Sequence, residues 1–204
     1  MAGSTIAKLG SIATEQWGMI TTAQAGNAGV SRKTLSSLTA SGALERLAQG
    51  VYRMAGAPDA TLEINTIRVH WLTLGSSSSV VAAGRSAAAL HDIGDWFVGA
   101  SEFVSPSRRT TRVKDVRIRV RLLEPEDAIF VDGMPTLSVE RTIADLLESG
   151  EDLSLVAGAL RDAARMGTLT SPQRLRILLH PLARRNGATD GEELAERLAH
   201  IAGD

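Results

Sequence analysis

The chain has 204 residues, of which 44% are hydrophobic, and it can therefore bury one large core or two small ones. It has no cysteine, which excludes disulfide bonds and thiolate metal sites. It also lacks the long apolar run of a signal peptide or a membrane span, so we expect a cytoplasmic protein without a membrane partner. The formal net charge of −1 hides a segregation of charge: residues 1–57 carry five basic and two acidic side chains, residues 106–121 seven and one, and residues 122–204 eight and fifteen. Two segments can thus attract a polyanion although the chain is nearly neutral.

Three helices are predicted at the start of the chain, and a glycine turn joins the second to the third. Apolar residues with helical spacing indicate a first helix over residues 4–17. Thr21 and Thr22 are suited to cap a second helix that runs to about residue 28, and Gly29 then interrupts the chain. This pattern is typical of a helix-turn-helix.

The third helix carries the side chains that we expect to contact DNA. Ser31 is its expected N-cap, Leu35 and Leu38 point inward, and Gly42 ends it. The first turn of such a helix enters the major groove, where arginine can bind guanine through two hydrogen bonds. The alternative is an ordinary solvated helix face. The expected DNA-binding residues on this helix are Arg32, Lys33, Thr34 and Ser37.

A short hairpin follows, with Gln49-Gly50 at its turn. Helix, helix, glycine turn, helix and hairpin, in that order, make a winged helix-turn-helix, which binds double-stranded DNA. Arg46 and Arg53 on the hairpin are candidates for DNA phosphate contacts and, equally, for structural ion pairs. Residues 55–58 have the composition of a linker. We therefore expect a DNA-binding domain over residues 1–57 and a second domain over residues 58–204.

The second domain is predicted to be a mixed α/β domain with a small sheet and several helices, which makes the fold class of the whole chain α+β. Asp59 and Ser138 are expected helix caps, and Asp132-Gly133 indicates a hairpin between strands over residues 128–131 and 134–136. The other expected strands are 103–105 and 116–121. Helices are predicted at about 61–74, 85–93, 138–148, 153–166, 171–179 and 190–201.

The segment Val116–Arg121 alternates aliphatic and basic residues, so its three arginines share one face of a strand. We expect that face to point away from the core. With the preceding loop it forms a basic surface, which DNA or a partner can use because like charges held this close repel one another. A solvent-facing sheet edge is the alternative. The residues of this basic surface are Arg108, Arg109, Arg112, Lys114, Arg117, Arg119 and Arg121.

No segment has the pattern of an enzyme active site. The four histidines lie singly, without metal-site spacing. A nuclease of the PD-(D/E)xK kind requires a lysine shortly after its second carboxylate, and no lysine follows Lys114. Ser138, Arg141 and Asp145 fall on one side of a helix, and Arg141 and Asp145 are spaced as an i, i+4 pair. A helix cap and a buried polar network are the expected roles there. We predict no catalytic residue, no metal and no cofactor.

Three stretches together resemble a known family: Gly18–Leu35, Gly50–Arg53 and Val131–Leu146. In that order and spacing, the chain is similar, from about Ile6 to Leu179, to the AbiEi-type antitoxins of bacterial toxin–antitoxin pairs. The pattern Gly-x-Pro-Thr…Ser-x-Glu-Arg-Thr-x-x-Asp in the third stretch is the most specific part. The resemblance implies a winged helix that represses its own operon by binding inverted repeats in the promoter. It also implies a C-terminal domain that counters a nucleotidyltransferase-like toxin, directly or functionally.

Two other interpretations remain open at this point. One is a transcriptional regulator whose C-terminal domain senses a small ligand. The other makes the C-terminal domain an enzyme that modifies the toxin or its target, although the sequence offers no nucleotide-binding motif for it.

Overall fold

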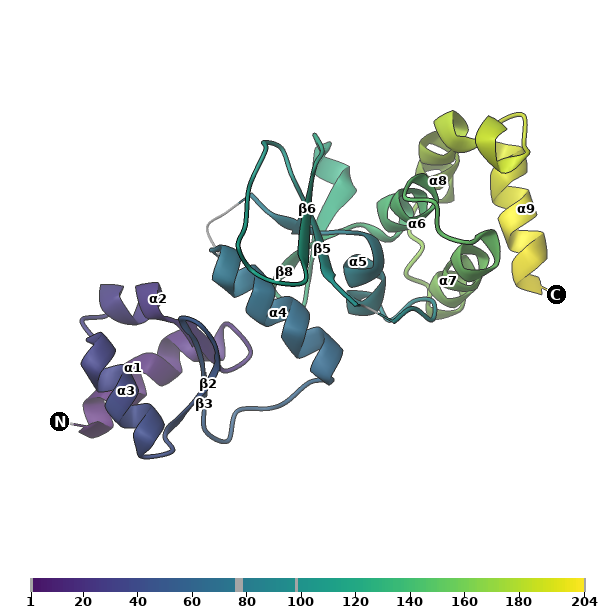
Figure 1. The fold of residues 1–204 in the computed structure, drawn as a ribbon. Helices are drawn as coiled ribbons and strands as arrows, with labels where there is room; N and C mark the ends of the chain where they lie inside the picture. The colour runs from purple at the N-terminus through teal and green to yellow at the C-terminus, as the bar shows by residue number, and fades with distance from the viewer. Residues whose placement is uncertain (1, 76–78, 98, 204) are drawn as a thin grey trace. The chain divides into compact units, whose positions relative to one another are not determined.

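The computed structural model describes residues 2–75, 79–97 and 99–203 and divides into two compact units, Met1–Ser78 and Ser79–Asp204 (Figure 1). This division falls one helix later than the expected boundary at residue 57. Within the described residues, no helix combines the length and the apolar character that crossing a membrane demands.

The N-terminal unit is a winged helix followed by one further helix. A three-stranded antiparallel sheet in the order β1-β3-β2 packs beside α1, α2 and α3. Leu9, Ala25 and Leu35, one from each helix, are fully buried in the shared core. The elements are α1 (Ala2–Thr14), β1 (Met19–Thr21), α2 (Thr22–Asn27), α3 (Arg32–Ala40), β2 (Leu44–Ala48), β3 (Val51–Met54) and α4 (Leu62–Leu74).

The predicted starts of α2 and α3 are confirmed in detail. The Thr21 hydroxyl accepts a hydrogen bond from the backbone N–H of Gln24, and the Gln24 side chain in turn accepts one from the Thr21 N–H, which is a complete capping box. Ser31 caps α3 in the predicted way. Strand β1 was not predicted, because its three residues are too few for an alternating pattern to be recognised.

Residues 55–58 are held against the winged helix rather than forming a free linker. A Cβ added to Gly18 (φ +75°) would lie 2.2 Å from the Cβ of Ala57, so only glycine fits at this contact. Beyond it, the buried guanidinium of Arg68 on α4 lies 4.7 Å from the ring centroid of Trp17, and Trp71 meets Trp17 edge-on at 6.2 Å. These contacts place α4 in the N-terminal unit.

The cap of α4 is Thr61, whose hydroxyl accepts from the Ile64 N–H at 3.3 Å, and the prediction of Asp59 was wrong. The Asp59 carboxylate instead accepts hydrogen bonds from Arg53 and Asn65, each at 2.5 Å. The Asp59 carboxylate thus binds the side chains of the wing and of α4 and does not accept from a backbone N–H of the helix start.

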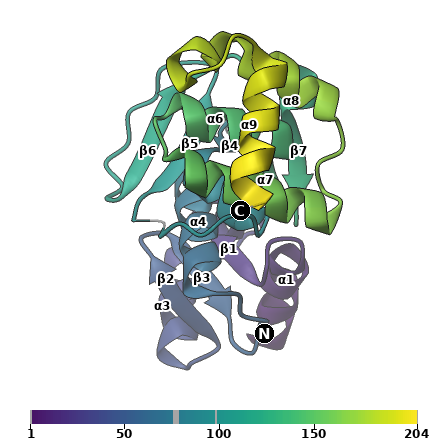
Figure 2. The ribbon, with the colours of Figure 1, turned by 90° about the vertical axis from the view of Figure 1, so that its right-hand side faces the viewer.

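The C-terminal unit is a five-stranded mixed sheet with helices packed on one face. Its strand order is β6-β5-β4-β8-β7, in which β4/β8 and β5/β6 run parallel and the other two pairs run antiparallel. Figure 2 shows α6 to α9 in front of the sheet. The strands are β4 (Val81–Ala82), β5 (Ser101–Ser105), β6 (Val116–Val120), β7 (Ala128–Val131) and β8 (Met134–Leu137). The helices are α5 (Gly84–Leu90), α6 (Val139–Glu148), α7 (Leu153–Met166), α8 (Pro172–Leu179) and α9 (Gly191–Gly203), with short 3₁₀ turns at Pro125–Asp127, His180–Leu182 and Arg184–Asn186.

The predicted hairpin around Asp132-Gly133 is confirmed, and both residues have positive φ (47° and 77°), as a two-residue turn between twisted strands requires. Ser138 caps α6 as predicted. The core of the unit lies among α6, α7, α8 and α9 and includes the fully buried Ile143, Val156 and Leu194. The α+β fold class is therefore confirmed.

Candidate nucleic-acid interface

The first turn of α3 presents basic side chains on a well-anchored helix end. The Ser31 hydroxyl accepts from the backbone N–H of Thr34 at 3.1 Å and lies 2.9 Å from the Thr34 hydroxyl. Leu35 is fully buried beneath the turn, whereas Arg32 and Lys33 are exposed. Because cap and core fix the backbone, the two cations extend from a rigid position.

The four predicted residues of α3 differ in how available they are. Arg32, Lys33 and Ser37 are exposed, and Thr34 is half-buried with its hydroxyl beside that of the cap. The start of α3 also borders an open hollow of about 690 Å³. That hollow is lined by Thr22, Ala23, Gly26, Gly29, Val30, Ser31 and Arg32, so small side chains leave space beside the helix end.

The hairpin of β2 and β3 is the wing of the winged helix, and its two arginines have opposite surroundings. Arg46 faces Tyr52 across the hairpin and is exposed, with its Nε 3.4 Å from the carbonyl oxygen of Ala48. Arg53 faces Glu45 and therefore points to the other side of the sheet. Arg46 thus shares its face with the buried Leu44 and with the three-helix core, whereas Arg53 points toward α4.

Arg53 is engaged by two carboxylates. Its guanidinium lies 2.6 Å from Glu45 and 2.5 Å from Asp59, and its side chain is only 18% exposed. The hydrogen bond with Glu45 raises the pKa of Arg53, and the Asn65 amide, together with Arg53, lowers the pKa of Asp59. Of the two roles predicted for Arg53, the geometry favours the structural ion pair.

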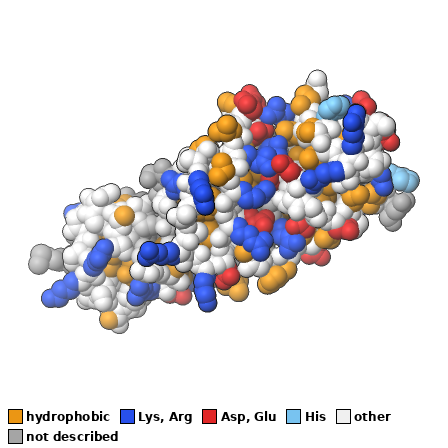
Figure 3. Space-filling model, turned by 45° about the horizontal axis from the view of Figure 1, so that its top comes forward, with side chains coloured by type: hydrophobic (Ala, Val, Ile, Leu, Met, Phe, Trp, Pro, Cys, Tyr) orange, Lys and Arg blue, Asp and Glu red, His pale blue; other side chains and the backbone are white. Residues whose placement is uncertain are grey.

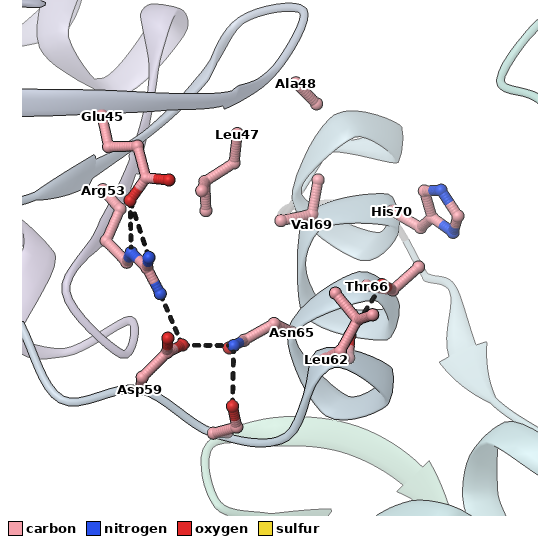
Figure 4. A pocket seen from close by; sticks show the side chains of 11 residues that line it. Glu45, Leu47, Ala48, Arg53, Asp59, Leu62, Asn65, Thr66, Val69 and His70 are labelled. Atoms are coloured by element: carbon pink, nitrogen blue, oxygen red, sulfur yellow. Dashed lines mark hydrogen bonds and ion pairs between the residues drawn. The ribbon is translucent and has the colours of Figure 1, made fainter.

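These groups form one wall of a hollow of about 410 Å³ between the wing and α4 (Figure 4). Leu47 from the wing and Val69 from α4 point into the space beside the chain of dashed contacts that joins Glu45, Arg53, Asp59 and Asn65. Glu45, Arg53 and Asp59 are paired with one another. The hollow is therefore a space between the wing and α4 whose charged wall is already neutralised.

The expected orientation of the arginines on β6 was wrong. Arg117, Arg119 and Arg121 lie on the same side of the strand. On that side, Arg119 and Arg121 form ion pairs with carboxylates of α6. Side-chain exposure falls along the strand from 73% at Arg117 to 36% at Arg119 and 20% at Arg121. The aliphatic Val120 on the opposite face is 61% exposed. The pattern of alternation was right, but the buried side was assigned incorrectly.

Asp145 is the centre of this charged cluster. It is fully buried and accepts hydrogen bonds from both terminal nitrogens of Arg119 and from the backbone N–H of Gly84. Arg121 lies 3.3 Å from Asp145 and 2.7 Å from Glu148. On the face drawn in Figure 3, basic and acidic side chains lie next to one another over the C-terminal unit. The predicted polar network therefore exists and ties α6 to β6 and α5.

Arg141 belongs to the same network, although not through the expected i, i+4 pair. Its guanidinium donates to Glu148 at 2.8 Å, while Asp145 is occupied by the arginines of β6. Burial and the positive charge of Arg121 lower the pKa of Arg141. Sequence spacing alone could not identify this pairing, because the competing arginines come from a different element.

The remaining four cations of the basic surface lie in the connection between β5 and β6. Arg108, Arg109, Arg112 and Lys114 are all exposed. The structure thus separates the predicted basic surface into an exposed basic loop and a paired cluster, with Arg117 between them. Within the described residues, no group of His, Asp or Glu side chains is arranged to hold a metal ion.

Comparison with known protein families gives a match within the N-terminal unit. Residues 11–55 match the family model of the AbiEi antitoxin transcriptional regulators. The predicted resemblance is thereby confirmed. The AbiEi match covers the end of α1, all of α2 and α3 and the wing, and it supports a role as an antitoxin and transcriptional regulator. It does not reach Val131–Leu146, which was taken as the most specific part of the resemblance.

A solved structure resembles the chain over nearly its whole length. The crystal structure of the RV2827C protein from Mycobacterium tuberculosis matches with a TM-score of 0.55 and 18% sequence identity, covering 98% of this chain and 78% of that one. At this identity the likeness shows the fold alone. No curated protein matches the chain.

Proposed function

We propose that this protein is an antitoxin that represses its own operon, with DNA binding in the N-terminal unit and toxin neutralisation in the C-terminal unit. The observation that carries the proposal is the coincidence of the AbiEi match with an exposed, capped recognition helix. The toxin we infer from the family resemblance is nucleotidyltransferase-like, and the operator is an inverted repeat in the promoter.

In this proposal Arg32 and Lys33 read the major groove, Ser37 and Thr34 add polar contacts, and Arg46 contacts phosphate from the wing. Two features of the structure support these roles. The three charged side chains are exposed, and no carboxylate of the described residues is paired with any of them. Arg53 is left out of the interface because Glu45 and Asp59 already hold it.

The test uses the full chain and the promoter of its own operon. An Arg32→Ala/Lys33→Ala variant should lose binding to the promoter duplex, by about 1–3 kcal/mol for each base that is read through a bidentate contact. It should still rescue cells in which the co-transcribed toxin is expressed, because neutralisation is assigned to the other unit. An Arg165→Ala/Arg184→Ala variant removes two exposed positive charges from the C-terminal unit and serves as the matched control. Wild-type promoter affinity in the double variant would refute the recognition helix, and loss of rescue would refute the division of labour.

A further inference from the structure

The connection between β5 and β6 is unusual in its course. The two strands are parallel neighbours, so the chain must return along the full length of the pair before β6 can begin. It does so over residues 106–115 without regular secondary structure, and we name this segment the basic crossover loop. Its base is pinned at both ends: Ser101 N–H donates to the Asp115 carbonyl at 2.8 Å, and Arg121 N–H donates to the Ser105 carbonyl at 2.9 Å.

The cations of this loop differ from those of the adjoining strand. The carboxylates of Asp145 and Glu148 neutralise Arg119 and Arg121. In contrast, no carboxylate of the described residues is paired with any of the four loop cations, which are Arg108, Arg109, Arg112 and Lys114. The loop contains a single acidic residue, Asp115. Four full positive charges therefore face solvent on a short segment whose base is fixed.

The other residues of the loop indicate the chemistry of its partner. Ser107, Thr110 and Thr111 add hydroxyl groups among the cations, the loop has no aromatic residue, and its one aliphatic side chain, Val113, is half-buried. Protein interfaces are anchored by aromatic and arginine side chains that fill pockets, and this loop has arginines but no aromatic side chain to accompany them. Arginine, lysine, serine and threonine are the usual partners of phosphate oxygens in protein–DNA complexes.

We propose that the basic crossover loop binds the phosphodiester backbone of duplex DNA without reading its bases. It is a second DNA-binding surface of the chain, in addition to α3, and the inference rests on the proposed function only in taking DNA as the ligand. The paired cluster behind the loop contributes by holding β6 on α6, so the loop starts and ends at fixed points.

The test compares three full-length variants on two DNA duplexes, the promoter and a random sequence of equal length. The loop variant is R108Q/R109Q/R112Q/K114Q. The charge-matched control is R161Q/R165Q/R176Q/R184Q, which removes the same charge from exposed positions in α7, in α8 and in the 3₁₀ turn Arg184–Asn186. The third variant is the Arg32→Ala/Lys33→Ala protein. Affinity is measured by fluorescence anisotropy over a series of salt concentrations, and folding is checked by circular dichroism and thermal melting.

The loop variant should bind both duplexes more weakly, with an unchanged preference for the promoter, because phosphate contacts carry no sequence information. Its salt dependence should be shallower by about 0.9 for each phosphate that the variant no longer neutralises. A loop variant that matches the charge control in affinity and slope overturns the proposal. So does one that binds DNA normally but no longer rescues toxin-expressing cells, since the loop would then serve a protein partner.

Failure of the proposed function has a different signature. If the wild-type chain shows no preference for the promoter, the recognition helix is refuted, while the comparison of loop and control variants on the random duplex still decides the role of the loop. If the Arg32→Ala/Lys33→Ala protein loses promoter preference and the loop variant equals its control, the winged helix stands and the loop proposal falls.

Discussion

Both terminal nitrogens of Arg119 donate to the carboxylate of Asp145, at 2.9 and 2.5 Å, and this carboxylate has no exposure to solvent. The pair joins the edge strand β6 to α6. Burial lowers the pKa of Arg119, but the hydrogen bonds and the charge of Asp145, together with the charges of Glu102 and Glu148, raise it by more, so the pKa of Arg119 lies above its ordinary value.

Replacing Asp145 by asparagine should destabilise the C-terminal unit. The substitution leaves Arg119 and Arg121 beside a neutral amide that cannot accept two guanidinium hydrogen bonds and the Gly84 N–H together. We expect a decrease of about 2–4 kcal/mol in the free energy of unfolding, at the lower end of the range for breaking a buried ion pair because Arg119 is partly exposed and water can solvate it. Urea unfolding checks the value, with Glu196→Gln on the exposed side of α9 as control. Equal stabilities of the two variants would contradict the role given to the cluster.

Gly18→Ala should be more harmful than Gly29→Ala. Both glycines have nearly the same positive φ, 75° and 77°, so both substitutions carry a similar left-handed strain of about 1–2 kcal/mol. Only at Gly18 would the new Cβ collide with Ala57, whereas at Gly29 nothing lies within 4 Å. The collision should add about 1–3 kcal/mol, as overpacking does. Thermal unfolding of the two variants measures the difference, and a difference near zero would show that residues 55–58 are a free linker after all.

His91 should make the protein less stable in mildly acidic solution. Burial lowers the pKa of His91, outweighing the carbonyl of Leu137, which accepts from its Nε2 at 2.7 Å, and the charge of Glu140. Because the unfolded chain then binds the proton more tightly than the folded one, stability falls as pH decreases through about 6.5, the ordinary value for histidine. The slope should not exceed about 1.4 kcal/mol per pH unit for one proton. His91→Gln should flatten the dependence of urea midpoints on pH in this window, and an unchanged dependence in this variant would contradict the role given to His91.

Substitutions of the two arginines of the wing should have different effects, one on promoter binding and the other on the stability of the N-terminal unit. Arg46→Gln should weaken promoter binding and reduce the salt slope by about 0.9, as expected when one phosphate is no longer neutralised. Arg53→Gln should leave the slope unchanged and lower the stability of the N-terminal unit, because it removes the partner shared by Glu45 and Asp59. Anisotropy titrations at several salt concentrations distinguish the two. The reverse pattern would place Arg53 in the interface and return Arg46 to solvent.

The local features of the chain followed from its sequence. Thr21, Ser31 and Ser138 cap helices where their hydroxyls reach the backbone three residues ahead, and Asp132-Gly133 turns a hairpin because both residues tolerate positive φ. These structures depend on interactions between residues that are close in the chain. The AbiEi resemblance of the N-terminal unit was visible for the same reason, since its helices, turn and wing lie in one continuous stretch.

The sides and partners of charged residues were decided only by the tertiary structure. Alternation showed that Arg117, Arg119 and Arg121 share a face, but a strand pattern with charge on one side does not reveal that a buried carboxylate lies opposite it. Likewise Arg141 pairs with Glu148, because Arg119 and Arg121 occupy Asp145. Charge pairing acts through space between elements far apart in the chain. The sequence therefore determined which residues are charged and how they are spaced, and the packing of β6 on α6 determined which of those charges are neutralised within the protein.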